Sequence, residues 1–211
     1  FNKYIIYLYL KKLILIIYNF FIQNYIINIM GAGILPIALY RGSLFLLLGQ
    51  ERHNNLWCDF GGSPNKGEKP FKTAIREGSE ELNGFFGTES DLEETVNNSM
   101  ILSISYDKYT TYIFSTKYDY NLVYYFNNVN NFAELHLKDK VNINHNGLFE
   151  KTNIRWFKIN YLKNPKFKKI VRPHFHAHID SIVKNEKFII SHIQSMKDTY
   201  VKKELPPIEL L

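Results

Sequence analysis

The chain has 211 residues, of which 45% are hydrophobic, 16% aromatic and 22% charged; this composition excludes a wholly disordered protein and predicts one folded domain. Its one cysteine, Cys58, excludes an internal disulfide framework and a multi-cysteine metal site, so we expect a reducing, cytoplasmic compartment. The net charge is +6, but without the three lysines of residues 1–29 the chain has 23 basic against 20 acidic residues. That excess is too small to predict nucleic-acid binding from charge.

Residues 1–29 differ from the rest of the chain, because they consist almost entirely of Ile, Leu, Tyr, Phe, Asn and Lys. Asn19, Gln23 and Asn24 interrupt their apolar stretch, whereas a membrane-spanning helix needs about 20 mainly apolar residues. No small-residue cleavage site follows, and a Met-Gly pair stands at positions 30 and 31. We therefore expect an upstream hydrophobic extension read in frame, with a membrane or surface segment as the less favoured interpretation. Residues 30–200 then form the domain and residues 201–211 a tail.

The first predicted elements are strands. The apolar runs Gly33–Tyr40 and Ser43–Gly49 flank the turn residues Arg41 and Gly42, a pattern typical of a β-hairpin. Leu56–Phe60 predicts a third strand, which ends in a double glycine.

A loop and a helix follow these strands. Gly61–Lys69 contains three glycines and a proline, which indicates a loop. Pro70–Leu82 predicts a helix, because proline suits its first turn. Asn83 and Gly84 tolerate the left-handed backbone that ends a helix.

The second half of the chain adds strands and then helices. Met100–Phe126 predicts two or three antiparallel strands, and Asn127–Gly147 a loop with a short helix around Phe132–Leu137. Ile154–Lys158 predicts a last strand, and Arg172–Met196 helical segments. This order indicates an α+β fold, with strands and helices in an α/β/α arrangement.

The predicted helix Pro70–Leu82 carries an unusual acidic face. Glu77, Glu80 and Glu81 lie beside its apolar face, and like charges at these spacings repel by roughly 0.2–0.5 kcal/mol per pair. A sequence that retains this repulsion indicates a bound cation, and oxygen ligands suit Mg²⁺ or Mn²⁺. The alternative is an acidic face exposed to solvent.

The spacing around this helix resembles a known motif. Gly62, five residues, Glu68, seven residues, Arg76-Glu77, two residues and Glu80-Glu81 resemble the box of the Nudix hydrolase family. A looser resemblance extends from Met30 to about His178. Two positions depart from the motif: Gly78 stands where the family has a bulky aliphatic residue, and Asn83 stands at the closing glycine.

The resemblance implies a Nudix-type α/β/α sandwich with a mixed sheet, a catalytic loop and helix, and C-terminal helices. It implies hydrolysis of a diphosphate linkage in a nucleoside diphosphate derivative by water that Mg²⁺ or Mn²⁺ activates. The implied metal ligands come from the box and the residue before it: the Gly61 carbonyl, Glu68, Glu77, Glu80 and Glu81. Arg76 is implied to pair with these carboxylates. Glu150 is the favoured general base, and Glu134 and a box glutamate are the alternatives.

Residues outside the box give weaker signals. Arg41, Arg52 and Lys66 are candidate phosphate contacts, although each suits a solvated surface position better. Trp57 and Trp156 suit the core better than base stacking, because their neighbours are strand residues.

Two further patterns concern metals and partners. His174, His176 and His178 predict a helix with histidines near its surface rather than a zinc site. We expect a nucleotide-type small molecule as substrate and no membrane partner. The alternative activities are decapping of mRNA, with Lys163–Lys169 as the RNA contact, and nucleotide binding without hydrolysis. The sequence carries no signal for an oligomeric state.

Overall fold

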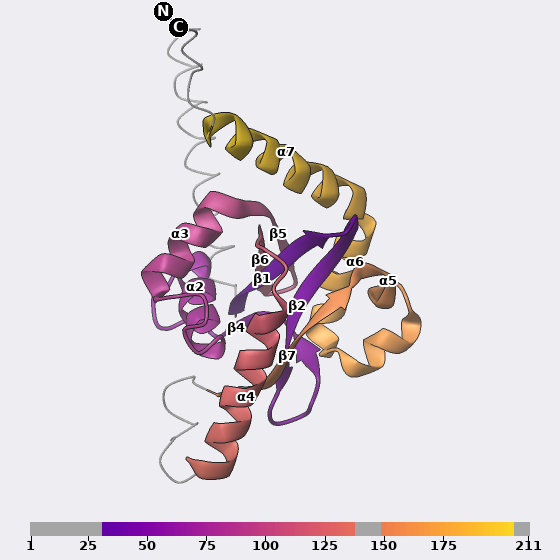
Figure 1. Cartoon of the computed structure of the whole chain (residues 1–211). Helices are drawn as coiled ribbons and strands as arrows, with labels where there is room; N and C mark the ends of the chain where they lie inside the picture. Colours follow the sequence, from indigo (N-terminus) through magenta and orange to yellow (C-terminus); the bar gives the residue numbers. More distant parts are fainter. Residues whose placement is uncertain (1–30, 138–148, 205–211) are drawn as a thin grey trace, which may run out of the picture.

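The computed structural model describes residues 31–137 and 149–204, and within them a mixed β-sheet lies between two layers of helices (Figure 1). This is the expected α+β class. The predicted extension 1–29, the start at Met30, residues 138–147 of the predicted loop and residues 205–211 of the predicted tail lie outside the described residues.

The predicted hairpin is confirmed and forms the centre of the sheet. Strand β1 (Gly31–Tyr40) pairs antiparallel with β2 (Ser43–Glu51). Arg41 and Gly42 both have positive φ, 48° and 72°, as a two-residue hairpin turn requires. On its other side β1 pairs with β6 (Tyr109–Ser115) in parallel, which makes the sheet mixed.

The sheet forks beside β1. The prediction of one strand over Leu56–Phe60 is wrong, because this segment divides between two partners. Strand β3 (Trp57–Cys58) pairs with β2, whereas β4 (Phe60–Gly62) pairs with the beginning of β1. Strand β7 (Lys151–Lys158) pairs with β2, so β2, β3 and β7 form one branch, and β4 stays with β1.

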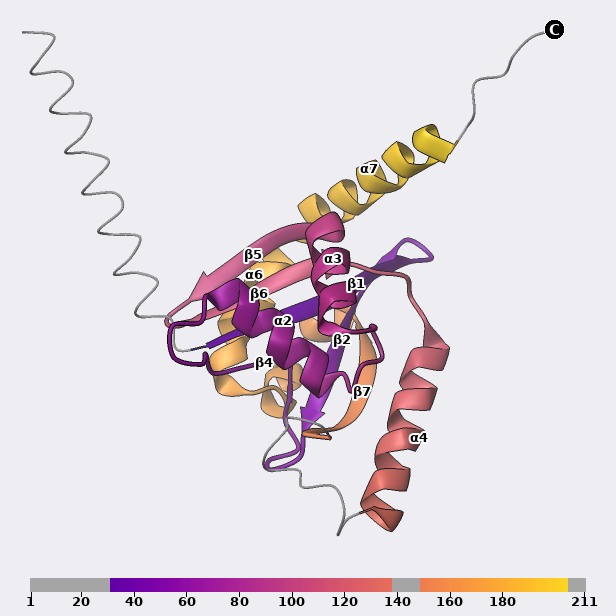
Figure 2. The same cartoon turned by 90° about the vertical axis from the view of Figure 1, so that its left-hand side faces the viewer.

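Two helices cover one face of the sheet (Figure 2). Helix α2 (Pro70–Glu81) agrees with the prediction, and Asn83 and Gly84 after it have φ of 50° and 72°. Helix α3 (Glu89–Ser99) was not predicted, although its N-cap residue, Thr88, forms a capping box.

The aromatic segment after β6 is a helix. Strands β5 (Met100–Tyr106) and β6 form the predicted antiparallel pair. The prediction of strand as far as Phe126 is wrong: α4 (Tyr120–His136) begins where Asp119 accepts the backbone N–H of Asn121. Its buried positions follow the helical period, although its Tyr and Phe residues have a high strand propensity.

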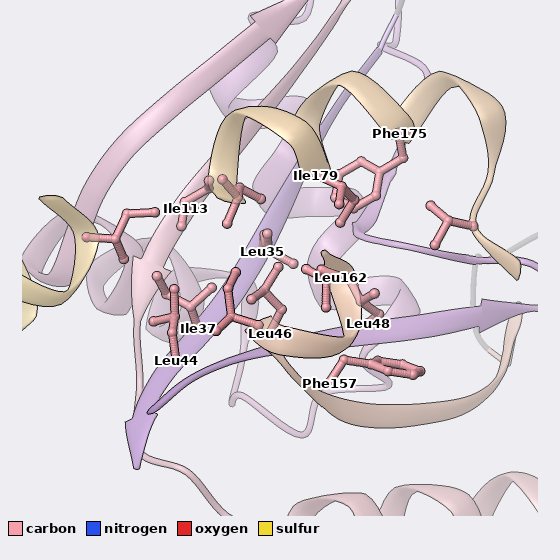
Figure 3. Packing of buried hydrophobic residues seen from close by; sticks show 14 of the residues in the cluster. Leu35, Ile37, Leu44, Leu46, Leu48, Ile113, Phe157, Leu162, Phe175 and Ile179 are labelled. Atoms are coloured by element: carbon pink, nitrogen blue, oxygen red, sulfur yellow. The ribbon is translucent and has the colours of Figure 1, made fainter. Parts of the chain in front are cut away.

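The C-terminal segments cover the opposite face. They comprise α5 (Ile159–Leu162), two short 3₁₀ helices (Pro165–Ile170 and Pro173–Phe175), α6 (His176–Lys184) and α7 (Glu186–Glu204). Figure 3 shows strand residues such as Leu35 and Leu46 packed against Phe175 and Ile179. None of the helices in the described residues is long and apolar enough to cross a membrane.

Candidate active site

Arg76 links the loop after β4 to α2. Its Nε and Nη2 each donate to a different oxygen of Glu68 at 3.0 Å, and Nη2 also donates to the Ser63 carbonyl at 3.0 Å. Its Nη1 lies 2.9 Å from Glu77 and 3.4 Å from Glu80. Hydrogen bonds from Arg76, which outweigh the effect of desolvation, lower the pKa of Glu68 to about 2. Arg76 therefore holds three box carboxylates in one arrangement.

Two glycines make room for this arrangement. A Cβ on Gly62 would lie 2.4 Å from an oxygen of Glu77, so the Glu77 carboxylate rests directly against the glycine backbone. A Cβ on Gly78 would lie 2.4 Å from Ile34 Cδ1. The departure from the motif at position 78 thus has a packing reason, because Ile34 of β1 occupies the space that a bulky residue would need.

Of the two predicted acids outside the box, Glu150 lies near α2. Burial raises the pKa of Glu150, and the charge of Glu77 raises it further. Burial also raises the pKa of Glu80 against the attraction of Arg76, and Glu77 and Glu150 add to the rise. Glu134 instead pairs with Arg52 at the end of β2. Glu77, Glu80 and Glu150 are therefore close enough to repel one another.

Glu81 faces the interior and has a partner that sequence reasoning missed. Its side chain is 3% exposed, and it pairs with Lys151, which is fully buried, at 3.1 Å. Lys151 also pairs with Glu51 at 2.7 Å, and Glu51 accepts from Arg172 at 2.8 Å and from the Cys58 thiol at 3.0 Å. No local pattern marks Lys151, because its partners lie on β2 and α2.

The pKa values of the two carboxylates in this buried cluster are shifted in opposite directions. Burial raises the pKa of Glu81 to about 8, because the loss of solvation outweighs the attraction of Lys151. Burial also acts to raise the pKa of Glu51, but Lys151, the Cys58 thiol and Arg172 together lower it to about 2. Glu51 is therefore the ionised partner of Lys151 at neutral pH.

Gly61 contacts Glu81 through its amide. The Gly61 N–H donates to Glu81 at 2.8 Å, and the residue pairs with Gly33 in the β1–β4 ladder. The Gly61 carbonyl remains a predicted ligand. The contact fixes the C-terminal end of α2 to β4 on the branch of the sheet that carries β1.

The three candidate phosphate contacts are not brought together. Arg41 follows the far end of β1, about 30 Å from the end that pairs with β4, so the structure does not bring it to this site. Arg52 is engaged by Glu134 and by the Phe149 carbonyl at 3.0 Å, which removes it as a free cation. Lys66 is exposed in the loop before α2 and stays a candidate.

Both tryptophans pack in the interior, as preferred from the sequence. Trp156 is 7% exposed and donates to the Asp119 carbonyl at 2.9 Å. Trp57 is half-buried, with its ring edge-on to Phe157 at 4.9 Å between centroids.

The expectation of surface histidines is wrong for His178, which is fully buried and stacks on Phe175. His176 lies 2.9 Å from the Lys168 carbonyl. Burial lowers the pKa of His174 to about 4, helped by the charge of Arg172, so this imidazole is neutral at pH 7.

A pocket of about 340 Å³ opens beside β4. One wall is the backbone of Gly61, Gly62 and Ser63, and the Glu77 carboxylate lies against Gly62. The remaining lining includes aromatic rings and cations: Tyr106, Lys108, Tyr109, Arg172 and His174. Rings and cations of this kind suit a base and a phosphate.

The acidic side chains fit a divalent cation in their chemistry. Glu77, Glu80 and Glu150 offer hard oxygen donors, and a cation would oppose the burial and the repulsion that raise the pKa of Glu80 and Glu150. Across residues 31–137 and 149–204, no three Asp, Glu, His or Cys side chains already surround a common point. Arg76 pairs with Glu77 and Glu80, and Lys151 pairs with Glu81. These side chains would have to rotate to bind a metal ion together.

Comparison with known proteins gives similarities of fold. No family model matches the chain, and no curated protein matches its sequence. A binary complex of the Ap4A hydrolase of C. elegans is 17% identical over 76% of this chain and 98% of that chain, with a TM-score of 0.44. The NUDIX domain of Shewanella oneidensis NrtR, complexed with ADP ribose, is 10% identical over 74% and 84%, with a TM-score of 0.36. These values are too low to carry substrates or residue roles over to this chain.

Proposed function

We propose that this chain hydrolyses a diphosphate linkage in a nucleoside diphosphate derivative, with Mg²⁺ or Mn²⁺ as its cofactor. The observation that carries the proposal is the grouping of Glu68, Glu77 and Glu80 around Arg76, with the Glu77 carboxylate against Gly62 of the pocket wall. Their residue types and their spacing in the box support it.

The carboxylates of Glu77 and Glu80 would hold the divalent ion, with Glu68, Glu81 and the Gly61 carbonyl as further predicted ligands. When bound, such an ion lowers the pKa of water and neutralises phosphate charge. Arg76 fixes the rotamers of the ligands through the contacts described above.

The reaction itself needs a base and a place for the substrate. The Glu150 carboxylate accepts the proton of a water that attacks phosphorus, and the bond from phosphorus to the bridging oxygen breaks. Burial raises the pKa of Glu150, which makes its carboxylate a stronger base than a solvated one. Lys108 would hold phosphate, and the Tyr106 and His174 rings would contact the base.

The test is the formation of the two phosphorylated products, separated by chromatography, with Mg²⁺ from nucleoside triphosphates, sugar nucleotides, dinucleoside polyphosphates, NADH and capped RNA. We expect activity on at least one small molecule, and Glu77→Gln or Glu80→Gln to lower its turnover at least 100-fold without lowering the melting temperature. Glu94→Gln, on the exposed face of α3, is the matched control and should retain activity.

The panel also separates the alternatives. Hydrolysis of capped RNA alone would favour decapping, although Lys163 and Lys168 of the proposed RNA contact already pair with Glu186 and Asp180. Binding of a nucleotide without its hydrolysis would favour a non-hydrolytic module and would contradict the proposed reaction. Hydrolysis of capped RNA alone would agree with the reaction and contradict the small-molecule substrate.

A further inference from the structure

Phe149 has a backbone conformation that aromatic residues rarely adopt. Its φ is 63°, in the left-handed region, and nothing in a phenylalanine side chain compensates for the strain. Strained residues of this kind persist only where the surrounding structure holds them, and they gather at functional sites. Phe149 directly precedes Glu150, so the backbone conformation of Phe149 sets the direction in which the Glu150 side chain extends from the backbone.

Two side chains from distant elements hold the Phe149 backbone. Asn83, after α2, accepts the Phe149 N–H on its Oδ1 at 2.9 Å. Arg52, after β2, donates from Nε to the Phe149 carbonyl at 3.0 Å, and its own backbone N–H donates to the Glu150 carbonyl at 3.1 Å. Both polar groups of the Phe149 backbone are thus occupied, and the next carbonyl is also held.

Asn83 ends helix α2 at a position where glycine would be energetically more favourable. Its φ of 50° is one that glycine adopts without strain. Its Nδ2 is buried and has no hydrogen-bond partner among the described residues, which is unfavourable. The advantage of asparagine over glycine here is the Oδ1 that meets Phe149.

We propose that Asn83 and Arg52 are positioning residues that fix the Phe149 peptide and thereby the place of Glu150 beside the end of α2. The role assigned to Glu150 rests on the proposed function. The departure of position 83 from glycine then adds a contact that links the end of the box helix to the residue before the proposed base.

Asn83→Gly tests this inference, because glycine keeps the helix end and removes the acceptor. We expect amide hydrogen exchange at Phe149 to rise about tenfold or more. We also expect kcat on the best substrate of the panel to fall by roughly 10- to 100-fold, with KM nearly unchanged. Adding Glu150→Gln to Asn83→Gly should cause little further loss, because both changes act on the same group.

Two further variants complete the experiment. Asn83→Asp keeps an acceptor oxygen and should retain the slow exchange of Phe149. Asn55→Gly makes the same substitution at an exposed position with φ of 60°, and should change neither exchange nor kcat.

Unchanged exchange at Phe149 in Asn83→Gly would overturn the inference whatever the activity. Faster exchange with unchanged kcat would overturn the positioning role. A wild-type protein inactive on the whole panel would overturn the proposed function instead, and the exchange measurement would still decide whether Asn83 holds the peptide.

Discussion

Replacing Glu81 by glutamine should stabilise the metal-free protein at pH 8, whereas the same replacement of Glu51 should destabilise it. Both carboxylates lie against the buried Lys151, at 3.1 and 2.7 Å, so the pair is matched in substitution and in partner. They differ in pKa, which burial raises to about 8 for Glu81, and which Lys151, Cys58 and Arg172 lower to about 2 for Glu51.

The magnitudes follow from these pKa values, since each unit is worth about 1.4 kcal/mol. Below pH 4.5 Glu81 is protonated in both the folded and the unfolded state. Between pH 4.5 and 8 Glu81 ionises in the unfolded state but stays protonated in the folded state, which favours unfolding. The wild type therefore loses about 5 kcal/mol of unfolding free energy, which Glu81→Gln retains. Glu51 acts with the opposite sign: its ionisation contributes about 3 kcal/mol above pH 4.5, lost as the pH falls to 2.

Urea unfolding between pH 3 and 8, in the presence of a chelator, measures these differences. The gap between Glu81→Gln and wild type should widen with pH, and the deficit of Glu51→Gln should shrink toward pH 3. If Glu81→Gln is less stable than wild type at pH 8, the Lys151 pair and not desolvation sets the charge of Glu81, and the reasoning is refuted.

Three further substitutions test the packing and the pairing around α2. Gly78→Ala should lower the unfolding free energy by about 1–3 kcal/mol in urea, because its Cβ would overlap Ile34, and the same substitution should cost less in an Ile34→Ala background. Gly62→Ala should displace the Glu77 carboxylate and lower turnover while the circular dichroism spectrum stays unchanged; full turnover would count against a role for that carboxylate. Arg76→Lys loses the two parallel bonds to Glu68 and should cost about 1 kcal/mol in the same urea assay, with an unchanged midpoint as the contrary result.

The hairpin and the box helix follow from local sequence, because turn residues and helix ends act over a few positions. The approach of Arg76 to Glu80 is of the same kind, since residues four apart share a helix face. α4 was mistaken for strand, because its aromatic residues favour strands in isolation and only burial against the sheet reveals the helical period.

The buried cluster could not be predicted from local sequence. Lys151 and Glu51 are one hundred positions apart, and their contact depends on the pairing of β7 with β2. The position of Glu150 likewise depends on Asn83 and Arg52, whose side chains give no sign in the sequence of a shared target. Such contacts come from the topology of the sheet rather than from spacing along the chain.

The fork in the sheet places α2 and Glu150 on different branches. Lys151 lies on β7 in one branch and reaches Glu81 at the end of α2, which is attached to the other. A buried ion cannot lose its counter-ion cheaply, so positions 51 and 151 are not free to evolve one at a time. Homologues that lack this lysine should have changed position 51 as well, and the two columns of an alignment should covary.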